Sequence, residues 1–208
     1  MVSLNAISEA LQKGKADDVK NMVSQALEEK NDAKKVLEEG LIAGMDIIGG
    51  RFKRNEIYIP EVLIAARAMH AGMSILEPIL AESGVKMIGK VAIGTVKGDL
   101  HDIGKNLVAM MFKGAGFDVV DLGVDVAPEK FVGASDDGAD IVGLSALLTT
   151  TMVQMKGVLE SLKEKGSKAK AIIGGAPVTQ NYCDEIGADG YAADAATAVE
   201  IGKALIKA

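Results

Sequence analysis

The 208-residue sequence predicts an α/β protein in which a helical N-terminal domain (residues 1–84) precedes a doubly wound, Rossmann-like domain (residues 85–208) with a five-stranded parallel sheet. Two observations lead to this fold class. Apolar residues recur at helical spacing up to about residue 84. After Val85, short β-branched runs alternate with amphipathic stretches, which is typical of strands and helices that follow one another in a parallel sheet.

The first domain is expected to contain four short antiparallel helices. In the third, for example, Leu37, Leu41, Met45 and Ile48 share one helical face. A prolyl ring cannot donate a backbone hydrogen bond, so Pro78 is expected to kink or end the last helix. The start signals of the four helices are Ser3, Asp17 with Asp18, Asp32, and Pro60 with Glu61.

The second domain is expected to place a ligand site at one edge of its sheet. Ligands of doubly wound folds bind beyond the carboxyl ends of the strands, where the topology switches direction. The loops after the strands are rich in glycine and small hydroxyl residues, as a site for a large ligand requires. The predicted strands are 91–96, 117–122, 140–145, 170–175 and 189–193, each buried on both faces.

Composition excludes several function classes. A net charge of −6 with no basic stripe argues against a nucleic-acid surface. The single cysteine, Cys183, allows no internal disulfide and fits a reducing cytoplasm. The N-terminus turns polar before a signal core develops, and no apolar run is judged long enough to span a bilayer. A cytoplasmic protein with no membrane or nucleic-acid partner is expected.

The loop after the first strand carries a D-x-H-x-x-G pattern formed by Asp99, His101 and Gly104. One ring nitrogen of such a histidine can bind a metal while the acid holds the other nitrogen and sets the tautomer. Spacing alone leaves a second interpretation open, in which both are polar residues of a surface loop. Two histidines and one cysteine are too few for an ordinary zinc site. A single histidine ligand suits a metal that brings its own equatorial ligands, which means a macrocycle.

The stretch GKVAIGTVKGDLHDIGKNLVAMMFKGAGFDVVDLGVDVAPEKFV strongly resembles the cobalamin-binding domain of methionine synthase and of corrinoid proteins from anaerobic methyltransferase systems. GLSALLTTTM and IIGGAPVTQ match the same domain in the same order, and RFKRNEIYIPEVLIAARAM is similar to its preceding helical cap. The resemblance covers nearly the whole chain. It implies cobalamin as cofactor, as methylcobalamin, cob(I)alamin or a related corrinoid.

The resemblance also implies roles for single residues. His101 would be the lower axial cobalt ligand in a base-off, His-on arrangement, with the cofactor's own benzimidazole displaced. Asp99 would orient His101 and accept or stabilise its second proton. Thr151 would replace the serine that completes this proton relay in methionine synthase.

The other cofactor-binding positions follow the same motifs. Without the resemblance, Ser145 would be interpreted as a strand-end cap, Leu147 as core and Asp194 as an ordinary helix N-cap. The residues expected to bind the cofactor are Asp99, His101, Asp102, Ile103, Gly104, Ser145, Leu147, Thr149, Gly174, Gly175, Asp194, Ala195 and Met69.

The helical cap is expected to cover the upper, methyl-bearing face of the corrin. His70 is interpreted as an exposed helical histidine and not as a second metal ligand. The candidates for the upper face are Phe52, Ile59, Pro60, Leu63 and Met69, although such apolar stripes usually belong to a helical core.

The expected function is that of a non-catalytic methyl carrier in one-carbon metabolism. Its implied partners are a substrate-specific methyltransferase, a corrinoid:tetrahydrofolate or thiol methyltransferase, and a reductive activase. Two alternatives stay open: the cobalamin subunit of an adenosylcobalamin-dependent mutase, and a cobalamin-dependent sensor. A mutase subunit predicts no four-helix cap, and such sensors place a DNA-binding helix-turn-helix ahead of it. The sequence leaves the methyl donor open among methanol, methylamines, quaternary amines and methoxylated aromatics.

Overall fold

A computed structural model describes residues 2–82 and 87–207. The chain divides into two compact units: a helical unit of Met1–Met87 with Gly114–Gly116, and a sheet unit of Ile88–Lys113 with Phe117–Ala208. The predicted boundary between residues 84 and 85 lies outside the described residues.

The described residues of the helical unit form four helical stretches, as the sequence predicts. Helices α3, η1 and α4 follow one another without a break and form the third stretch, whose middle part is π-helical. Asp32 caps its start by accepting hydrogen bonds from the backbone nitrogens of Lys34 (2.7 Å) and Lys35 (3.2 Å). Helix α1 packs against η1 and α4, and α2 packs against α5. The elements are α1 (Leu4–Gln12), α2 (Ala16–Glu28), α3 (Ala33–Lys35), η1 (Val36–Ile42), α4 (Ala43–Lys53) and α5 (Ile59–Glu82).

Helix α5 corrects two expectations. Pro78 lies inside this helix, which continues to Glu82, so the proline does not end it. The stretch Ile59–Leu80 is also long and apolar enough to cross a membrane by length and composition, which the sequence reasoning overlooked. A core helix passes the same test, and Val62, Ala65 and Ala68 on α5 are buried.

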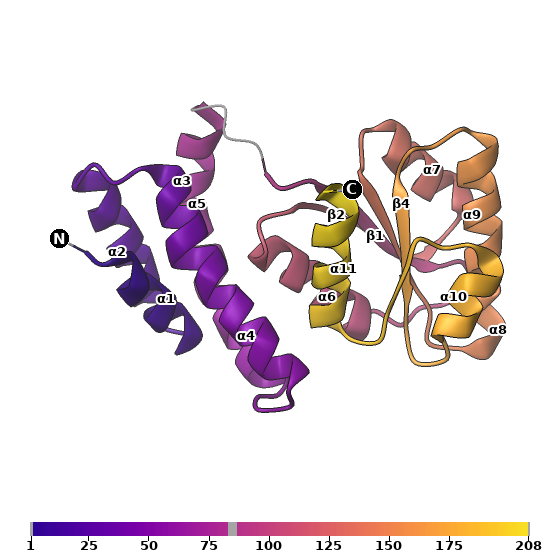
Figure 1. Ribbon diagram of the computed structural model, residues 1–208, viewed down its shortest axis with the longest axis horizontal. Coiled ribbons are helices and arrows are strands. Elements are labelled where there is room, and N and C mark those ends of the chain that lie inside the picture. Colours follow the sequence, from indigo (N-terminus) through magenta and orange to yellow (C-terminus); the bar gives the residue numbers. More distant parts are fainter. Residues whose placement is uncertain (1, 83–86, 208) are drawn as a thin grey trace. The chain divides into compact units, whose positions relative to one another are not determined.

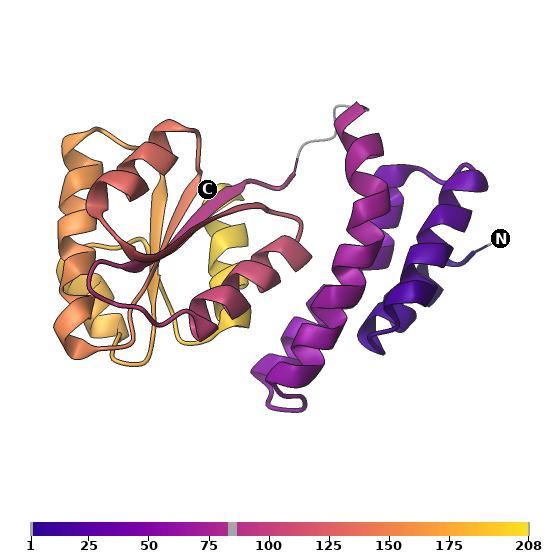
Figure 2. The ribbon, with the colours of Figure 1, turned by 180° about the vertical axis from the view of Figure 1, so that it is seen from behind.

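The sheet unit has five parallel strands in the order β2-β1-β3-β4-β5, which confirms the predicted doubly wound domain. Helices α6 and α11 cover one face, and α7, α9 and α10 cover the other (Figures 1 and 2). The topology switches direction between β1 and β3, so the loops after these strands lie where ligands of doubly wound folds bind. The strands are β1 (Lys90–Val96), β2 (Asp118–Val126), β3 (Ile141–Ser145), β4 (Lys170–Gly174) and β5 (Gly190–Ala192). The helices are α6 (Ile103–Gly114), α7 (Pro128–Asp136), α8 (Thr149–Met152), α9 (Gln154–Glu164), α10 (Gln180–Ile186) and α11 (Ala195–Lys207).

Strand β2 differs from its prediction in length and in burial. It runs to Val126 instead of ending at residue 122, because Gly123 and Asp125 adopt positive φ angles that let it continue through an irregular pairing with β1. As an edge strand it has exposed and half-buried positions, so it is not buried on both faces as expected. Residues 149–152, expected to belong to a loop, form the short helix α8.

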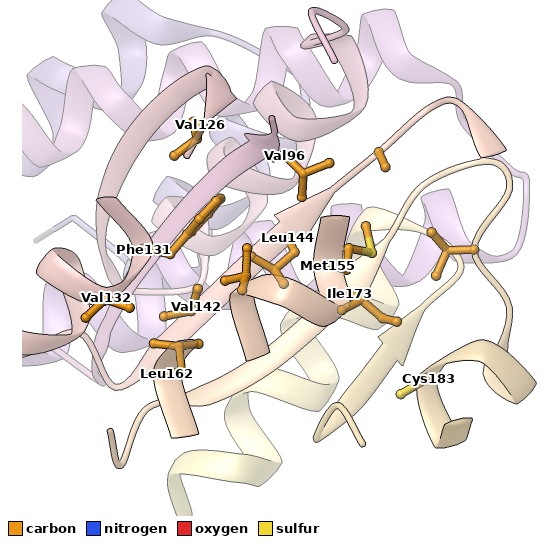
Figure 3. Close-up of a cluster of buried hydrophobic side chains, with 13 residues drawn as sticks. Val96, Val126, Phe131, Val132, Val142, Leu144, Met155, Leu162, Ile173 and Cys183 are labelled. Carbon is orange, nitrogen blue, oxygen red and sulfur yellow. The ribbon is translucent and has the colours of Figure 1, made fainter. Parts of the chain in front are cut away.

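The hydrophobic core on the α7, α9 and α10 face packs against strands β1, β3 and β4, whose carboxyl ends lead into the site loops. Phe131 of α7 and Met155 of α9 are fully buried there against strands β1, β3 and β4 (Figure 3). Burying a side chain of this size contributes about 1.5–3 kcal/mol. The buried members of this cluster are Val96, Val126, Phe131, Val132, Val142, Leu144, Ala146, Met155, Val158, Leu162, Ile173, Val178 and Cys183.

Candidate functional site

Asp99 is the centre of the candidate site, at the switch point of the sheet. It follows β1 in a tight turn, in which its backbone nitrogen donates to the carbonyl of Val96 (3.1 Å). Its side chain is fully buried. Burying a carboxylate is unfavourable in free energy unless its oxygens accept hydrogen bonds, so the donors around Asp99 must offset this cost.

Four hydrogen bonds fill the two oxygens of Asp99. Oδ1 faces Nδ1 of His101 at 2.7 Å and accepts from the His101 backbone nitrogen at 3.1 Å. Oδ2 accepts from the backbone nitrogen of Leu147 at 2.8 Å and from Oγ1 of Thr151 at 2.6 Å. An ionised carboxylate accepts about four hydrogen bonds, so this one is saturated. Asp99 thereby joins the loop after β1 to the segment after β3.

These contacts determine the charge of Asp99 and the tautomer of His101. Burial raises the pKa of Asp99, but the hydrogen bonds from Thr151, Leu147 and His101 outweigh it and hold the pKa well below its ordinary value. An anionic Asp99 can only accept a hydrogen bond, so Nδ1 of His101 carries a proton. The lone pair of the neutral imidazole then lies on Nε2, the nitrogen that can bind a metal.

The His101 side chain is 51% exposed and has large apolar neighbours in sequence that are exposed too. Thr95 anchors its backbone by donating from Oγ1 to the His101 carbonyl (2.8 Å). Leu100 is 72% exposed and Ile103 is 76% exposed, and Leu147 after β3 is also exposed instead of belonging to the core. Exposed apolar groups of this size, next to an oriented histidine, suit a large flat apolar ligand.

The glycines of the site leave room for a ligand or for the backbone. A side chain at Gly104 would meet no atom within 4 Å, so nothing in the described protein fills the space beside it. Gly175 has a φ of +127°, and a Cβ there would collide with the carbonyl oxygen of Ala146. Gly174 is also tight, since its Cβ would lie 2.9 Å from the carbonyl oxygen of Ala192. Gly174 at the end of β4 and Gly175 directly after it therefore let the chain pass close to its neighbours at the same edge of the sheet.

The other predicted positions differ in what they offer to a ligand. Ser145 is half-buried at the end of β3, and Thr149 is exposed at the start of α8. Asp102 is exposed and accepts a hydrogen bond from Asn106 (3.0 Å).

Asp194 acts as a helix N-cap, since it accepts from the backbone nitrogen (2.9 Å) and the hydroxyl (2.8 Å) of Thr197. Ala195 is 4% exposed. The geometry at these two positions is that of an ordinary helix start, and their part in ligand binding stays a prediction.

In the helical unit, the candidates also divide by exposure. Ile59, Pro60 and Leu63 are exposed on α5, and Phe52 on α4 is half-buried. Met69 is 3% exposed, so its side chain offers little surface to a ligand. His70 is exposed, as expected.

Sequence reasoning missed three residues that support the site loops. Lys105 of α6 is buried and donates to both oxygens of Asp121 (2.6 and 2.7 Å). Asp125 at the end of β2 accepts from the backbone nitrogen of Gly98 (2.7 Å). Alternating acids and glycines in the segment D-L-G-V-D-V were the available signal, because such residues mark a strand end with unusual backbone angles.

Comparison with known proteins identifies the ligand. A family model described as a B12 binding domain matches residues 89–200, and a second model of the same description matches residues 3–77. A corrinoid protein of Desulfitobacterium hafniense is 42% identical over 99% of this chain and 98% of its own length. The chain belongs to the corrinoid protein family.

Other relatives extend the likeness to proteins of methyltransferase systems. The dimethylamine corrinoid protein of Methanosarcina barkeri is 43% identical over 98% of this chain and 97% of its own length. A solved cobalamin-binding protein of Desulfitobacterium hafniense covers 99% of both chains with a TM-score of 0.81 and 32% identity. The methanol:cobalamin methyltransferase complex of Methanosarcina barkeri matches 97% of this chain and 78% of the solved chain, with a TM-score of 0.85 and 33% identity.

The cofactor of this corrinoid protein is cobalamin or a related corrinoid, and the described residues fit it. Among residues 2–82 and 87–207, no three His, Cys, Asp or Glu side chains are grouped to hold a metal ion. A corrin needs only one protein ligand, because the macrocycle fills the equatorial positions of its cobalt. The oriented His101, the exposed Ile103 and the open space at Gly104 are suitable for such a group.

Proposed function

We propose that this corrinoid protein carries a methyl group from a substrate-specific methyltransferase to a second methyltransferase, with Nε2 of His101 as the lower axial cobalt ligand. The methyl-carrying role is that of its family. The proposal includes base-off, His-on ligation of the cofactor and transfer of the methyl group to tetrahydrofolate or to a thiol. The single observation that carries it is the saturated Asp99 carboxylate, which holds His101 in the tautomer that a metal requires.

A bound corrinoid supplies a cobalt that can accept and release a methyl group. The protein would supply the axial base, His101, which could bind the cobalt or dissociate from it. Nε2 of the half-exposed His101 ring is the nitrogen that would bind the cobalt. The anionic Asp99 accepts the hydrogen bond of Nδ1 and would stabilise positive charge that develops on the imidazole.

Thr151 has a narrower role in this proposal than a proton relay. Its hydroxyl is buried and has one proton, which it donates to Asp99 at 2.6 Å, with the carbonyl of Leu148 as the second acceptor at 3.1 Å. Among the described residues, both hydrogen-bond partners of this hydroxyl are acceptors, so Thr151 donates its one proton and receives none from them. We infer that it keeps Asp99 anionic instead of passing protons to solvent.

The names of the relatives support a small methylated compound as the methyl donor. Similar proteins are dimethylamine and trimethylamine corrinoid proteins, and the solved methanol:cobalamin methyltransferase complex contains a chain similar to this one. A methylamine or methanol methyltransferase is therefore the proposed first partner, with a reductive activase and a cytoplasmic location as further expectations. The helical region matched by its own B12-binding model weighs against the mutase alternative.

The experiment compares His101→Ala with the matched control His70→Ala, since these are the two histidines of the chain. Wild type and the control should bind cobalamin with a base-off, His-ligated visible spectrum, whereas His101→Ala should lose the histidine signature. An unchanged spectrum in His101→Ala would overturn the axial role. Methyl transfer should also require an added methyltransferase, and efficient turnover by the isolated chain would refute the carrier role.

A further inference from the structure

The end of strand β2 holds the loop of Asp99 at two points. Oδ1 of Asp125 accepts from the backbone nitrogen of Gly98 at 2.7 Å. The backbone nitrogen of Asp125 donates to the carbonyl of Asp99 at 3.0 Å. Asp125 therefore forms hydrogen bonds with both peptide groups that flank the Gly98–Asp99 bond. Asp99 lies two residues before His101.

The backbone conformation of Asp125 is unusual and is required for these two hydrogen bonds. Its φ is 51°, in the left-handed region that side chains other than Asn and Asp rarely adopt. The pairing of β2 with β1 is irregular at the same place, where Gly123 has a φ of 88°. The backbone conformation at Asp125 is unfavourable. It directs both the side chain and the backbone amide of Asp125 toward the loop that contains Asp99.

An ion pair between the buried Lys105 and the 45% exposed Asp121 fixes the same irregular segment of β2, its bulge, from the other side. Nζ of Lys105 donates to Oδ1 and Oδ2 of Asp121 at 2.6 and 2.7 Å, and its side chain is 2% exposed. Oδ1 of Asp121 also accepts from the backbone nitrogen of Gly123 at 2.9 Å. Lys105 lies on α6, four residues after His101. The bulge is thus tied to the chain on both sides of the histidine.

We propose that Asp125 is a positioning residue for His101. By holding the two peptide groups that flank the Gly98–Asp99 bond, it determines where the carboxylate of Asp99 lies and therefore how His101 presents Nε2 to cobalt. This inference rests on the proposed axial role of His101. It assigns Asp125 a geometric function, in which the carbonyl-type acceptor and the positive φ matter and the negative charge does not.

Three variants separate these properties. Asp125→Asn keeps the acceptor and tolerates the positive φ but removes the charge. Asp125→Gly keeps the positive φ without strain and removes the acceptor, so it should fold. Asp118→Asn removes an exposed carboxylate at the other end of the same strand and is the matched control.

The first measurement uses the cofactor-free protein and amide hydrogen exchange by NMR. Exchange of the Gly98 amide should be about fivefold faster in Asp125→Gly, because one hydrogen bond of about 1 kcal/mol is lost. It should stay within about twofold of wild type in Asp125→Asn and in Asp118→Asn. Unchanged exchange of the Gly98 amide in Asp125→Gly would show that the Asp125 side chain does not hold this amide, independently of any cofactor.

The second measurement uses the cobalamin-loaded protein and its visible spectrum. The ratio of His-ligated to unligated cofactor should fall about fivefold in Asp125→Gly and be restored in Asp125→Asn. A spectrum of Asp125→Gly equal to wild type, or one of Asp125→Asn equal to Asp125→Gly, would refute the positioning role. Failure of the axial role is recognised separately, because the wild-type protein would then show no histidine signature while the Gly98 exchange result still stands.

Discussion

Replacing Thr151 by valine tests how strongly the buried hydroxyl stabilises Asp99. Valine has nearly the same shape, so the change removes the 2.6 Å hydrogen bond to Oδ2 and leaves the short helix α8 intact. Hydrogen bonds to charged groups contribute about 1.5–3 kcal/mol, and both partners are buried here. We expect Thr151→Val to lower the free energy of unfolding by about 2 kcal/mol at pH 7. Thr151→Ser, which keeps the hydroxyl, should lose less than about 1 kcal/mol.

The pH dependence of that loss follows from the lowered pKa of Asp99. A carboxyl group whose pKa is lower in the folded than in the unfolded protein adds stability above its unfolded value, near 3.8, and loses it as the pH falls through the folded value. Thr151→Val removes part of this contribution because the pKa of Asp99 moves back toward its ordinary value. The difference between wild type and Thr151→Val should therefore be full at neutral pH and shrink below about pH 4.

Urea unfolding followed by far-UV circular dichroism measures this difference, since the chain has no tryptophan to report by fluorescence. The titration is run at neutral pH and again below pH 4 for wild type, Thr151→Val and Thr151→Ser. Equal stabilities of the valine and serine variants would show that the hydroxyl does not support Asp99. A loss that stays constant with pH would refute the link between this hydrogen bond and the charge of Asp99.

Three further changes probe the neighbourhood of the site. Gly175→Ala should destabilise the fold by about 2–4 kcal/mol in chemical unfolding, because its Cβ would collide with the carbonyl oxygen of Ala146 at a positive φ. Gly104→Ala should leave the stability unchanged or slightly higher but weaken cobalamin binding about tenfold by titration, since its Cβ enters open space that the cofactor is proposed to use; equal binding would remove Gly104 from the site. Asp121→Ala should cost about 2–3 kcal/mol, because Lys105 is left buried without its carboxylate. Burial raises the pKa of Asp121, but the hydrogen bonds from Lys105 and Gly123 and the nearby lysine charges together outweigh it and lower the pKa. The loss should therefore diminish as the pH falls below about 4, and a loss that did not diminish would contradict the ion pair.

Much of the fold was predictable because its signals are local. Apolar spacing identified four helical stretches, and Asp32 caps the third as its position before the helix predicts. All five strands lie within a few residues of their predicted ranges. Pro78 does not end α5, which continues to Glu82. Strand β2 runs past its predicted end because glycine and aspartate can adopt the irregular backbone that extends it.

The site was less predictable, because its contacts join distant segments. Asp99 and His101 stand two residues apart, so a hydrogen bond between them follows from spacing and local geometry. Thr151 lies 52 residues from Asp99, and no periodicity brings the two together. The support from Lys105 and Asp125 escaped notice for the same reason, since each contacts a residue 16 or 27 positions away.

The sequence by itself determined the class of the fold and the motifs that resemble a cobalamin-binding domain, since both depend on residue type and short spacing. The resemblance then singled out His101 as the proposed cobalt ligand. Only the tertiary structure decided the state of that histidine. The switch of the sheet between β1 and β3 brings Leu147 and Thr151 onto Asp99, and four hydrogen bonds then keep a buried carboxylate ionised. A carboxylate needs donors on both oxygens to remain charged away from water, and those donors come from segments that only the folded sheet brings together.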